Sequence, residues 1–354
     1  MTDHIGISVR EDYAALAEKR ADALLASQTQ VVCCSEAYDV NLMKKVPKAV
    51  VEADFGCGNP TKYIRPGDIV LDLGCGAGMN CYIAAQIAGP SGSVIGIDFN
   101  DAMLGIARKA LPEFSASVEA APLAFRMGSA HDLALDLDQA NEYLRSNAPS
   151  DVIGIQKYQD LADKLRHEKT LISDNSVDVV ISNCVINLLA DRDKKLVFQE
   201  IFRVLKPGGR FAISDNVSNI PVPEAVKNDA MLWSACYAGV LQEQQFYSSL
   251  EATGFAGITI EVRNDDPAKI IEELEFYSIT VTGEKPLKSG GVDTPKVMYK
   301  GPSKAIVGDS GKMYRRGIPD TLSVADQYLI SSGGPFYILD DDVINQAPAK
   351  NACC

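Results

Sequence analysis

The sequence predicts an α/β protein built on a doubly wound, mostly parallel sheet. The first observation is a strand, glycine loop and helix in "DIVLDLGCGAGMNCYIAAQIAG", followed by a second buried strand, "GSVIGIDF". The second is the strand "VDVVISN", followed by the helix "KKLVFQEIFRVL", the turn "KPGG" and the strand "RFAISD". Strands and helices that alternate at this spacing are joined by right-handed crossovers, which make the strands parallel. The expected architecture is therefore Rossmann-like.

The chain before the sheet has a different character. Residues 10–28 place apolar side chains at helical spacing, and a turn-rich stretch follows with a short helix around 46–51. We interpret residues 1–66 as an N-terminal helical lid. The domain that carries the parallel sheet is then expected over 67–264.

Within that domain the alternation continues with the helix "NDAMLGIARKAL" and the strand "LAFRMG". Two runs with helical spacing in 136–172 predict an inserted pair of surface helices, since a structureless loop of that length is uncommon. Helices are next expected around 225–237 and 243–252, before a strand in "ITIEVRN".

The character changes again near the C-terminus, where short strands are broken by Gly and Pro. We expect a small C-terminal α+β domain, rich in strands, over 265–345. Residues 346–354 read as a tail that ends in Cys353 and Cys354.

The composition restricts the partners. A net charge of −13 disfavours nucleic acid and anionic lipid surfaces, because both are bound by clustered Lys and Arg. The sequence contains no apolar signal core and no run that could span a bilayer, so we expect a cytoplasmic protein, most simply a monomer. In a reducing compartment its nine cysteines are expected to be thiols rather than structural bridges.

The glycine loop indicates the cofactor. Asp72 stands two positions before Gly74-x-Gly76-x-Gly78, whereas dinucleotide sites use Gly-x-Gly-x-x-Gly to seat a pyrophosphate. An acidic residue at this place favours a cofactor with a positive centre and no phosphate. Asp98 follows at the end of the second strand, where a carboxylate can accept both hydroxyls of a ribose.

This combination resembles the class I methyltransferases, which bind S-adenosylmethionine. The resemblance implies that "GSAHDL" cradles the adenine and that no other cofactor is needed. The cofactor-binding residues expected on this basis are Asp72, Gly74, Cys75, Gly76, Gly78, Asp98, Phe99, Asn100, Met103, Ala130, His131 and Asn183.

Three cysteines from separate segments are candidates for a substrate site. Cys57 precedes the sheet between glycines, Cys184 lies at the carboxyl end of a strand, and Cys236 lies on a later helix. If they converge beside the methyl donor, they form a soft site; the spacing lacks the Cys-x-x-Cys pairs typical of structural zinc. As(III) takes three soft donors and keeps a lone pair that can act as a nucleophile. Cys75 and Cys81 are interpreted as structural thiols.

"GCG" before the sheet, "DLGCGAG", "VDVVISNCVINL", "EIFRVLKPGG" and "LWSACYAG" resemble, in order and spacing, the arsenite S-adenosylmethionine methyltransferases. The similarity covers about residues 32–262. It implies that Cys57, Cys184 and Cys236 bind As(III), and that Cys33 or Cys34 forms and relays a disulfide. The implied substrate is arsenite or its thiol conjugates, the products are methylated arsenicals, and the implied reductant is of the glutathione or thioredoxin type.

Two alternatives remain open at this stage. The insertion at 136–172 is longer than the family pattern, so the acceptor could be another soft metalloid or a small organic nucleophile. The chain could also be a thiol-rich metalloid-binding protein without turnover, although the intact glycine loop and Asp98 argue against lost cofactor binding.

Overall fold

The computed structural model describes residues 38–287, 294–330 and 334–339. Its centre is a nine-stranded sheet with the main order β3-β2-β1-β4-β5-β9-β7, in which β6 pairs with β5 and β8 with β9. The first five strands in this order are parallel to one another. They are β1 (Ile69–Leu73), β2 (Ser93–Asp98), β3 (Leu123–Met127), β4 (Val177–Asn183) and β5 (Leu205–Ser218). The predicted fold class is confirmed.

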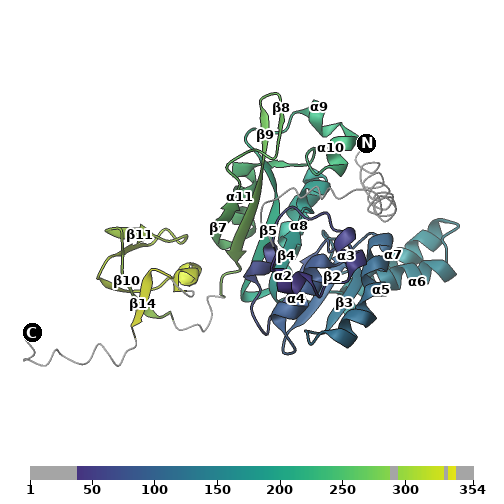
Figure 1. The fold of residues 1–354 in the computed structure, drawn as a ribbon, viewed down its shortest axis with the longest axis horizontal. Coiled ribbons are helices and arrows are strands. Elements are labelled where there is room, and N and C mark those ends of the chain that lie inside the picture. The colour runs from purple at the N-terminus through teal and green to yellow at the C-terminus, as the bar shows by residue number, and fades with distance from the viewer. Residues whose placement is uncertain (1–37, 288–293, 331–333, 340–354) are drawn as a thin grey trace, which may run out of the picture.

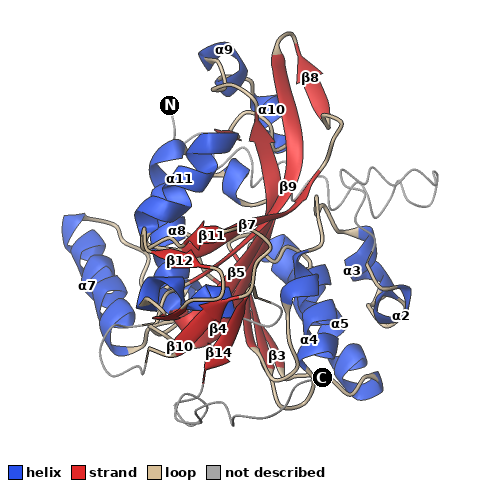
Figure 2. Cartoon of the chain, turned by 90° about the vertical axis from the view of Figure 1, so that its left-hand side faces the viewer, coloured by secondary structure: helices blue, strands red, loops and turns tan. Residues whose placement is uncertain are grey.

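Helices cover both faces of this sheet (Figure 2). One face packs against α4 (Met79–Ala88) and α5 (Asp101–Ser117), around buried Tyr82, Leu104 and Phe125. The other packs against α8 (Asp191–Val204) and α11 (Glu243–Thr253), around buried Phe198, Ile201 and Leu250. Because both faces are covered, the central strands are almost continuously apolar, as parallel strands usually are.

The predicted pair of inserted helices is present as α6 (Leu137–Ser146) and α7 (Val152–Glu168). Two ion pairs attach it to the domain: Arg108 Nη2 lies 2.7 Å from Asp138 Oδ2, and Arg166 Nε lies 3.0 Å from Asp132 Oδ2. The insertion projects at the side of the sheet where β3 lies (Figure 1).

Shorter elements complete the domain. They are α2 (Val40–Met43), α3 (Lys48–Glu52), η1 (Pro60–Tyr63), η2 (Ile186–Leu188), α9 (Glu224–Lys227), α10 (Ala230–Ser234) and β6 (Leu241–Gln242). The short helix expected around 46–51 is thus present as α3. The helix expected at 10–28 lies outside the described residues, as do Cys33, Cys34 and the tail.

The predicted turn in "KPGG" is a bulge inside β5. Leu205 is paired with Val177 and Arg210 with Val179, so four residues of β5 oppose one of β4. Gly208 there has φ +77°, a conformation that glycine adopts without strain.

The predicted boundary at residue 264 is wrong. After β7 (Ala256–Arg263), the chain forms β8 (Lys269–Ile271) and β9 (Leu274–Glu284), and both belong to the main sheet. β9 lies antiparallel between β5 and β7, pairing with β5 from Arg210 opposite Glu284 to Ser218 opposite Phe276. The sheet therefore continues to Glu284.

Beyond the main sheet the chain forms a small β-rich unit with its own core around Val297, Tyr314 and Phe336. Figure 1 shows it beside the β7 edge of the main domain. Gly257 N donates to Asp309 Oδ2 at 2.7 Å across this contact. Its elements are β10 (Lys296–Tyr299), β11 (Ala305–Val307), β12 (Met313–Arg315), β13 (Pro319–Thr321), η3 (Val324–Ile330) and β14 (Phe336–Leu339).

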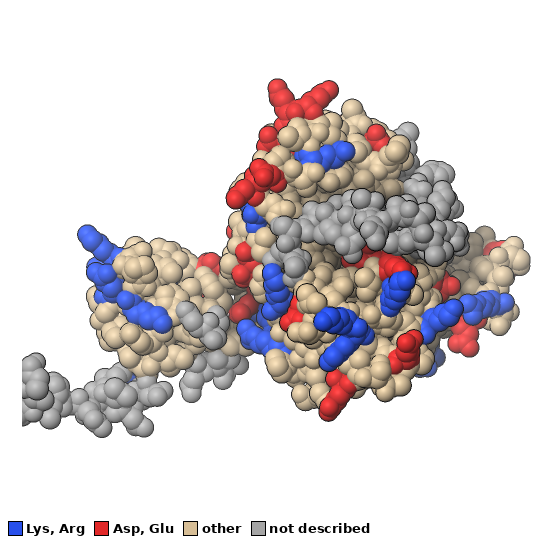
Figure 3. Space-filling model, viewed as in Figure 1, with Lys and Arg blue, Asp and Glu red and all other residues tan. Residues whose placement is uncertain are grey.

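On the face shown in Figure 3, Lys and Arg side chains are interspersed with Asp and Glu. In the part of the chain that the structure describes, no helix has the length and apolar character needed to cross a membrane.

Candidate active site

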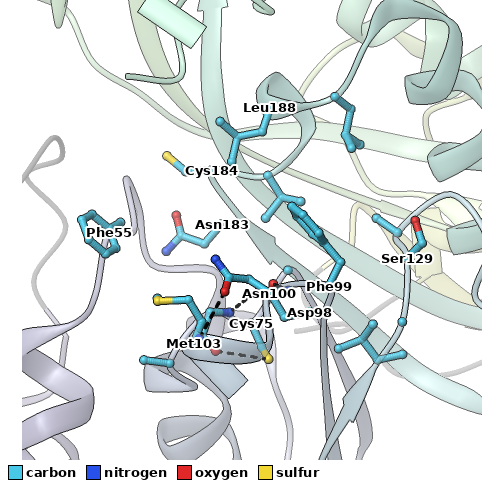
Figure 4. Close-up of a pocket in the computed structure, with 18 of the residues that line it drawn as sticks. Phe55, Cys75, Asp98, Phe99, Asn100, Met103, Ser129, Asn183, Cys184 and Leu188 are labelled. Carbon is cyan, nitrogen blue, oxygen red and sulfur yellow. Dashed lines mark hydrogen bonds between the residues drawn. The ribbon is translucent and has the colours of Figure 1, made fainter. Parts of the chain in front are cut away.

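A cavity of about 420 Å³ opens at the carboxyl ends of β1, β2 and β4 (Figure 4). Open parallel sheets bind ligands at this edge, because the strand order reverses there and leaves a crevice. The cavity is bounded by the glycine loop, the start of α5, the loop after β3, the loop after β4 and the segment 53–56.

The glycine loop needs glycine at two positions for both conformation and space. Gly74 and Gly78 have φ of +72° and +92°. A Cβ on Gly74 would lie 2.4 Å from Val185 Cγ2, and one on Gly78 would lie 2.7 Å from the Phe125 ring. Without side chains at these two positions, the loop packs closely against Val185 and Phe125, and its backbone is accessible to a ligand.

Asp98 faces the cavity from the end of β2, as predicted. Its two oxygens accept hydrogen bonds from the backbone N–H groups of Gly76 and Asn100, both at 2.8 Å. Burial raises the pKa of Asp98, although these N–H groups oppose the shift. Each oxygen has a further lone pair, which suits two vicinal hydroxyl groups.

Ten of the twelve predicted cofactor residues line the cavity. They are Gly74, Cys75, Gly76, Asp98, Phe99, Asn100, Met103, Ala130, His131 and Asn183. Asn100 also caps α5, accepting from the N–H groups of Ala102 and Met103. His131 is exposed, and its Nδ1 lies 3.1 Å from Ser129 Oγ.

The other two predicted cofactor residues, Asp72 and Gly78, do not line the cavity. Asp72 is 1% exposed and lies behind the loop, where Cys81 Sγ donates a hydrogen bond to its Oδ2 at 3.0 Å. Burial raises the pKa of Asp72 to about 7. Gly78 packs against Phe125 beneath the loop. Both residues support the loop from inside the protein.

The three candidate cysteines lie together in one buried cluster, against which Leu188 packs. Cys57 follows α3, Cys184 follows β4 and Cys236 follows α10. Cys57 and Cys184 are joined by a disulfide, with their Cα atoms 5.7 Å apart. The Sγ of Cys236 lies 3.9 Å from the carbonyl oxygen of Cys184. Cys184 also lines the cavity, so the cluster adjoins it.

Comparison with known protein families shows to which family the chain belongs. The sequence profile of the family described as "Methyltransferase domain" matches residues 64–164 and 159–254. The chain belongs to this family. The matched region contains β1 to β5 and thus the whole glycine-loop side of the cavity.

The methyltransferase is similar to characterised arsenite methyltransferases. It is 31% identical to that of Halobacterium salinarum over 304 residues (79% of this chain, 66% of the relative). It is 29% identical to the human enzyme over 265 residues (73% and 62%). The chain thus spans just under two thirds of the length of these curated relatives. The resemblance drawn from the sequence is confirmed.

A solved structure agrees with this similarity along nearly the whole fold. It is that of an arsenic (III) S-adenosylmethionine methyltransferase from Chlamydomonas reinhardtii, with a TM-score of 0.58 and 26% identity. The match covers 85% of this chain and 95% of that one.

Two of the cluster cysteines of this methyltransferase adopt an unusual backbone conformation. Cys184 has φ +59° and Cys236 has φ +62°, in the left-handed region that costs an L-residue roughly 1–2 kcal/mol. The Cys184 N–H donates to Ser214 O at 2.9 Å, and the Cys236 N–H donates to Trp233 O at 2.9 Å. Such strain persists where the surroundings impose it, and it is concentrated at functional sites.

Asp215 anchors the turn after Cys184. One of its oxygens lies within 4.8 Å of the Cys57 and Cys184 sulfurs. Oδ2 accepts from the N–H groups of Ile186 and Asn187, at 2.9 and 3.3 Å, and Oδ1 accepts from Asn187 Nδ2 at 2.6 Å. Oδ1 also accepts from Asn216 N at 2.9 Å, so its lone pairs are occupied and the carboxylate is a poor additional ligand. Burial raises the pKa of Asp215 to about 7.

Two further cysteines, Cys75 and Cys81, have a different environment. Cys75 and Cys81 are buried side by side against Gly96, where a Cβ would lie 2.9 and 2.6 Å from their sulfurs. Burial raises the pKa of Cys75 to about 11, and it also raises that of Cys81. Since thiolates are the reactive form, these thiols are chemically quiet, which agrees with their interpretation as structural.

Sequence reasoning missed part of the cavity wall. Ala53, Asp54, Phe55 and Gly56 line it from the N-terminal segment, and Asp193 lines it from α8. Phe55 is seen opposite Asp98 and Asn100 in Figure 4. The only signal was the position of these four residues directly before Cys57.

Proposed function

We propose that this methyltransferase transfers a methyl group from S-adenosylmethionine to As(III) bound by Cys57, Cys184 and Cys236. The observation that carries the proposal is the meeting of three cysteines, from three separate segments, in one buried cluster beside the cavity. The similarity to arsenite methyltransferases supports the choice of acceptor.

The cavity suits a cationic cofactor. Three carboxylates line it, from Asp54, Asp98 and Asp193, and no Lys or Arg stands among its described lining residues. Such a lining attracts a sulfonium and an ammonium group and repels a pyrophosphate. We assign the ribose hydroxyls to Asp98, the amino-acid part to the glycine loop, and the adenine to the loop that carries Ala130 and His131. When bound, S-adenosylmethionine supplies an electrophilic methyl group.

The protein's contribution is to hold the acceptor beside that methyl group. Arsenite exchanges its three hydroxyl groups for three thiols and releases water, which leaves a lone pair on arsenic. The As–C bond forms as the S–CH₃ bond of the donor breaks, and no general base is needed because the nucleophile carries no proton. Placement of this kind is worth roughly 7–11 kcal/mol of a barrier.

The Cys57–Cys184 disulfide provides a way to return arsenic to the trivalent state. Methylation oxidises arsenic by two electrons, and two thiolates that leave it as a disulfide return those electrons. An external thiol, of the glutathione or thioredoxin type, then reduces the disulfide. The resemblance implied a disulfide relayed through Cys33 or Cys34, which lie outside the described residues; the disulfide in the structure joins Cys57 and Cys184.

The test is arsenic speciation after incubation with S-adenosylmethionine, arsenite and a thiol reductant. We expect methylarsenicals from the wild type, and only the protein-free background from Cys184→Ser. Cys81→Ser is the matched control, because it changes a buried thiol outside the cluster and keeps a donor for Asp72. Absence of methylarsenicals from the reduced wild type would overturn the proposal in favour of another acceptor or of binding without turnover.

A further inference from the structure

The carboxamide of Asn183 is fully engaged with the loop that carries Cys57. Its Oδ1 accepts from the N–H groups of Cys57 and Gly58, at 2.8 and 3.0 Å. Its Nδ2 donates to Gly58 O at 2.8 Å and also lies 3.3 Å from Tyr38 Oη. Asn183 is thus bonded like a neighbouring peptide strand to residues that lie 125 or more positions earlier in the chain.

The two glycines beside Cys57 make this contact possible. A Cβ on Gly56 would lie 2.5 Å from Asn183 Nδ2, and one on Gly58 would lie 2.5 Å from Ser214 Cβ. The loop therefore fits between the end of β4 and the middle of β5 only because both neighbours of Cys57 lack side chains.

A third strand completes the support of Cys57. Ser278 on β9 donates from its Oγ to Cys57 O at 3.2 Å. The loop 54–59 lies between α3 and η1 and has no regular secondary structure of its own. Side chains of the sheet therefore contribute to its position at the disulfide, together with Tyr38, whose Oη donates to Gly58 O at 2.9 Å.

We propose that Asn183 is the positioning residue that presents Cys57 to Cys184. The inference rests on the proposed function in one respect, the use of this thiol pair to bind arsenic. The hydrogen bonds between Asn183 and the Cys57 loop do not depend on that function. Asn183 and Cys184 are consecutive, so a single turn of chain supplies one sulfur and fixes the loop that supplies the other. The sequence assigned Asn183 to the cofactor, and it does line that cavity, but its side-chain polar atoms are directed to the Cys57 loop.

Asn183→Asp tests the proposal with almost no change of volume. The carboxylate can still accept from the two N–H groups, but its second oxygen faces Gly58 O with no proton to donate. The direct readout is the equilibrium constant for disulfide formation between Cys57 and Cys184 with oxidised glutathione, which yields two reduced glutathiones. We expect this constant to fall about tenfold, with a similar loss of As(III) affinity.

Two measurements separate positioning from loss of fold. Circular dichroism should show a cooperative melt, and S-adenosylmethionine should still bind, because the other nine predicted cofactor residues that line the cavity are unchanged. Asn147→Asp is the matched control: it removes a comparable Nδ2 hydrogen bond, to Tyr143 O at 3.0 Å, on the exposed insertion. Its disulfide constant should equal that of the wild type.

Gly56→Ala provides a second, independent variant that keeps Asn183. The added methyl group displaces the carboxamide from the other side, so the same fall in the disulfide constant is expected. Wild-type disulfide constants in both variants would overturn the inference. If the equilibrium constant for disulfide formation falls in both variants while the wild type yields no methylarsenicals, the positioning role holds and the proposed function fails.

Discussion

The left-handed backbone at Cys184 and Cys236 predicts which substitutions at these positions are the more stable. In that conformation glycine is favoured over alanine by roughly 1 kcal/mol, because a Cβ is what the region penalises. We expect Cys184→Gly to have a higher free energy of unfolding than Cys184→Ala, and the same order at Cys236. Denaturant unfolding under reducing conditions measures both.

Cys81 is the control for this comparison, because it lies inside the helix α4. There the order should reverse, with Cys81→Ala more stable than Cys81→Gly by about 1 kcal/mol. A common order at all three positions would show that side-chain volume, and not backbone conformation, sets the difference.

The buried Asp72 predicts a dependence of stability on pH. Its pKa is raised to about 7 by burial, so the folded protein holds a proton that the unfolded chain has lost above its ordinary pKa of 3.8. The resulting stabilisation is complete at pH values below 3.8 and is lost as the pH rises towards about 7. We expect the unfolding free energy of the wild type, relative to Asp72→Asn, to fall by up to about 4 kcal/mol between pH 4 and 8. A difference that is flat across this range would contradict the assignment.

The sequence identified the side chains expected to take part in the chemistry better than it identified the residues that hold them in place. In the proposed chemistry the side chains of the three cysteines and Asp98 act directly, so a motif identifies them. Asn183 acts on backbone groups of Cys57 and Gly58, and backbone groups leave no mark on the sequence. Asp72 was predicted from the motif, but its position behind the loop depends on Cys81 and on packing that only the fold determines.

At the scale of elements, β9 shows where local pattern is insufficient. The parallel half of the sheet could be predicted because each strand is followed by a helix that covers it. β9 instead returns antiparallel beside β5, some sixty residues earlier in the chain, and no local feature encodes this pairing. The strand also supplies Ser278 to the Cys57 loop, so the boundary error at 264 removed part of the site.

Truncation tests the role of β9. A chain that ends at residue 264 loses the strand between β5 and β7 and leaves the long edge of β5 unpaired, so we expect it to be insoluble or unfolded. A chain that ends at residue 287 keeps the whole main sheet and should fold with a cooperative melt. Equal solubility and equal melting of the two chains would contradict the importance given to β9.

At the scale of the whole molecule, the proposed arsenic binding and the disulfide require the same sulfurs. In the form with the Cys57–Cys184 disulfide, two of the three cluster sulfurs are bonded to each other and are not available as ligands. We expect this form to bind no arsenite after gel filtration, and the reduced form to retain one arsenic per chain by elemental mass spectrometry. The single tryptophan, Trp233, lies three residues before Cys236 and should report binding by a change in fluorescence. Equal arsenic retention before and after reduction would exclude the disulfide as a barrier to binding.

The same disulfide encloses 127 residues of chain, from before β1 to the end of β4. A cross-link across so long a loop lowers the entropy of the unfolded chain, by roughly 5 kcal/mol of stability in the chain-entropy description. Under the proposed function, the oxidised form that does not bind arsenic is therefore also the more stable form. A thiol that reduces the disulfide restores the sulfurs needed for the next methylation and, by the same step, removes the added stability.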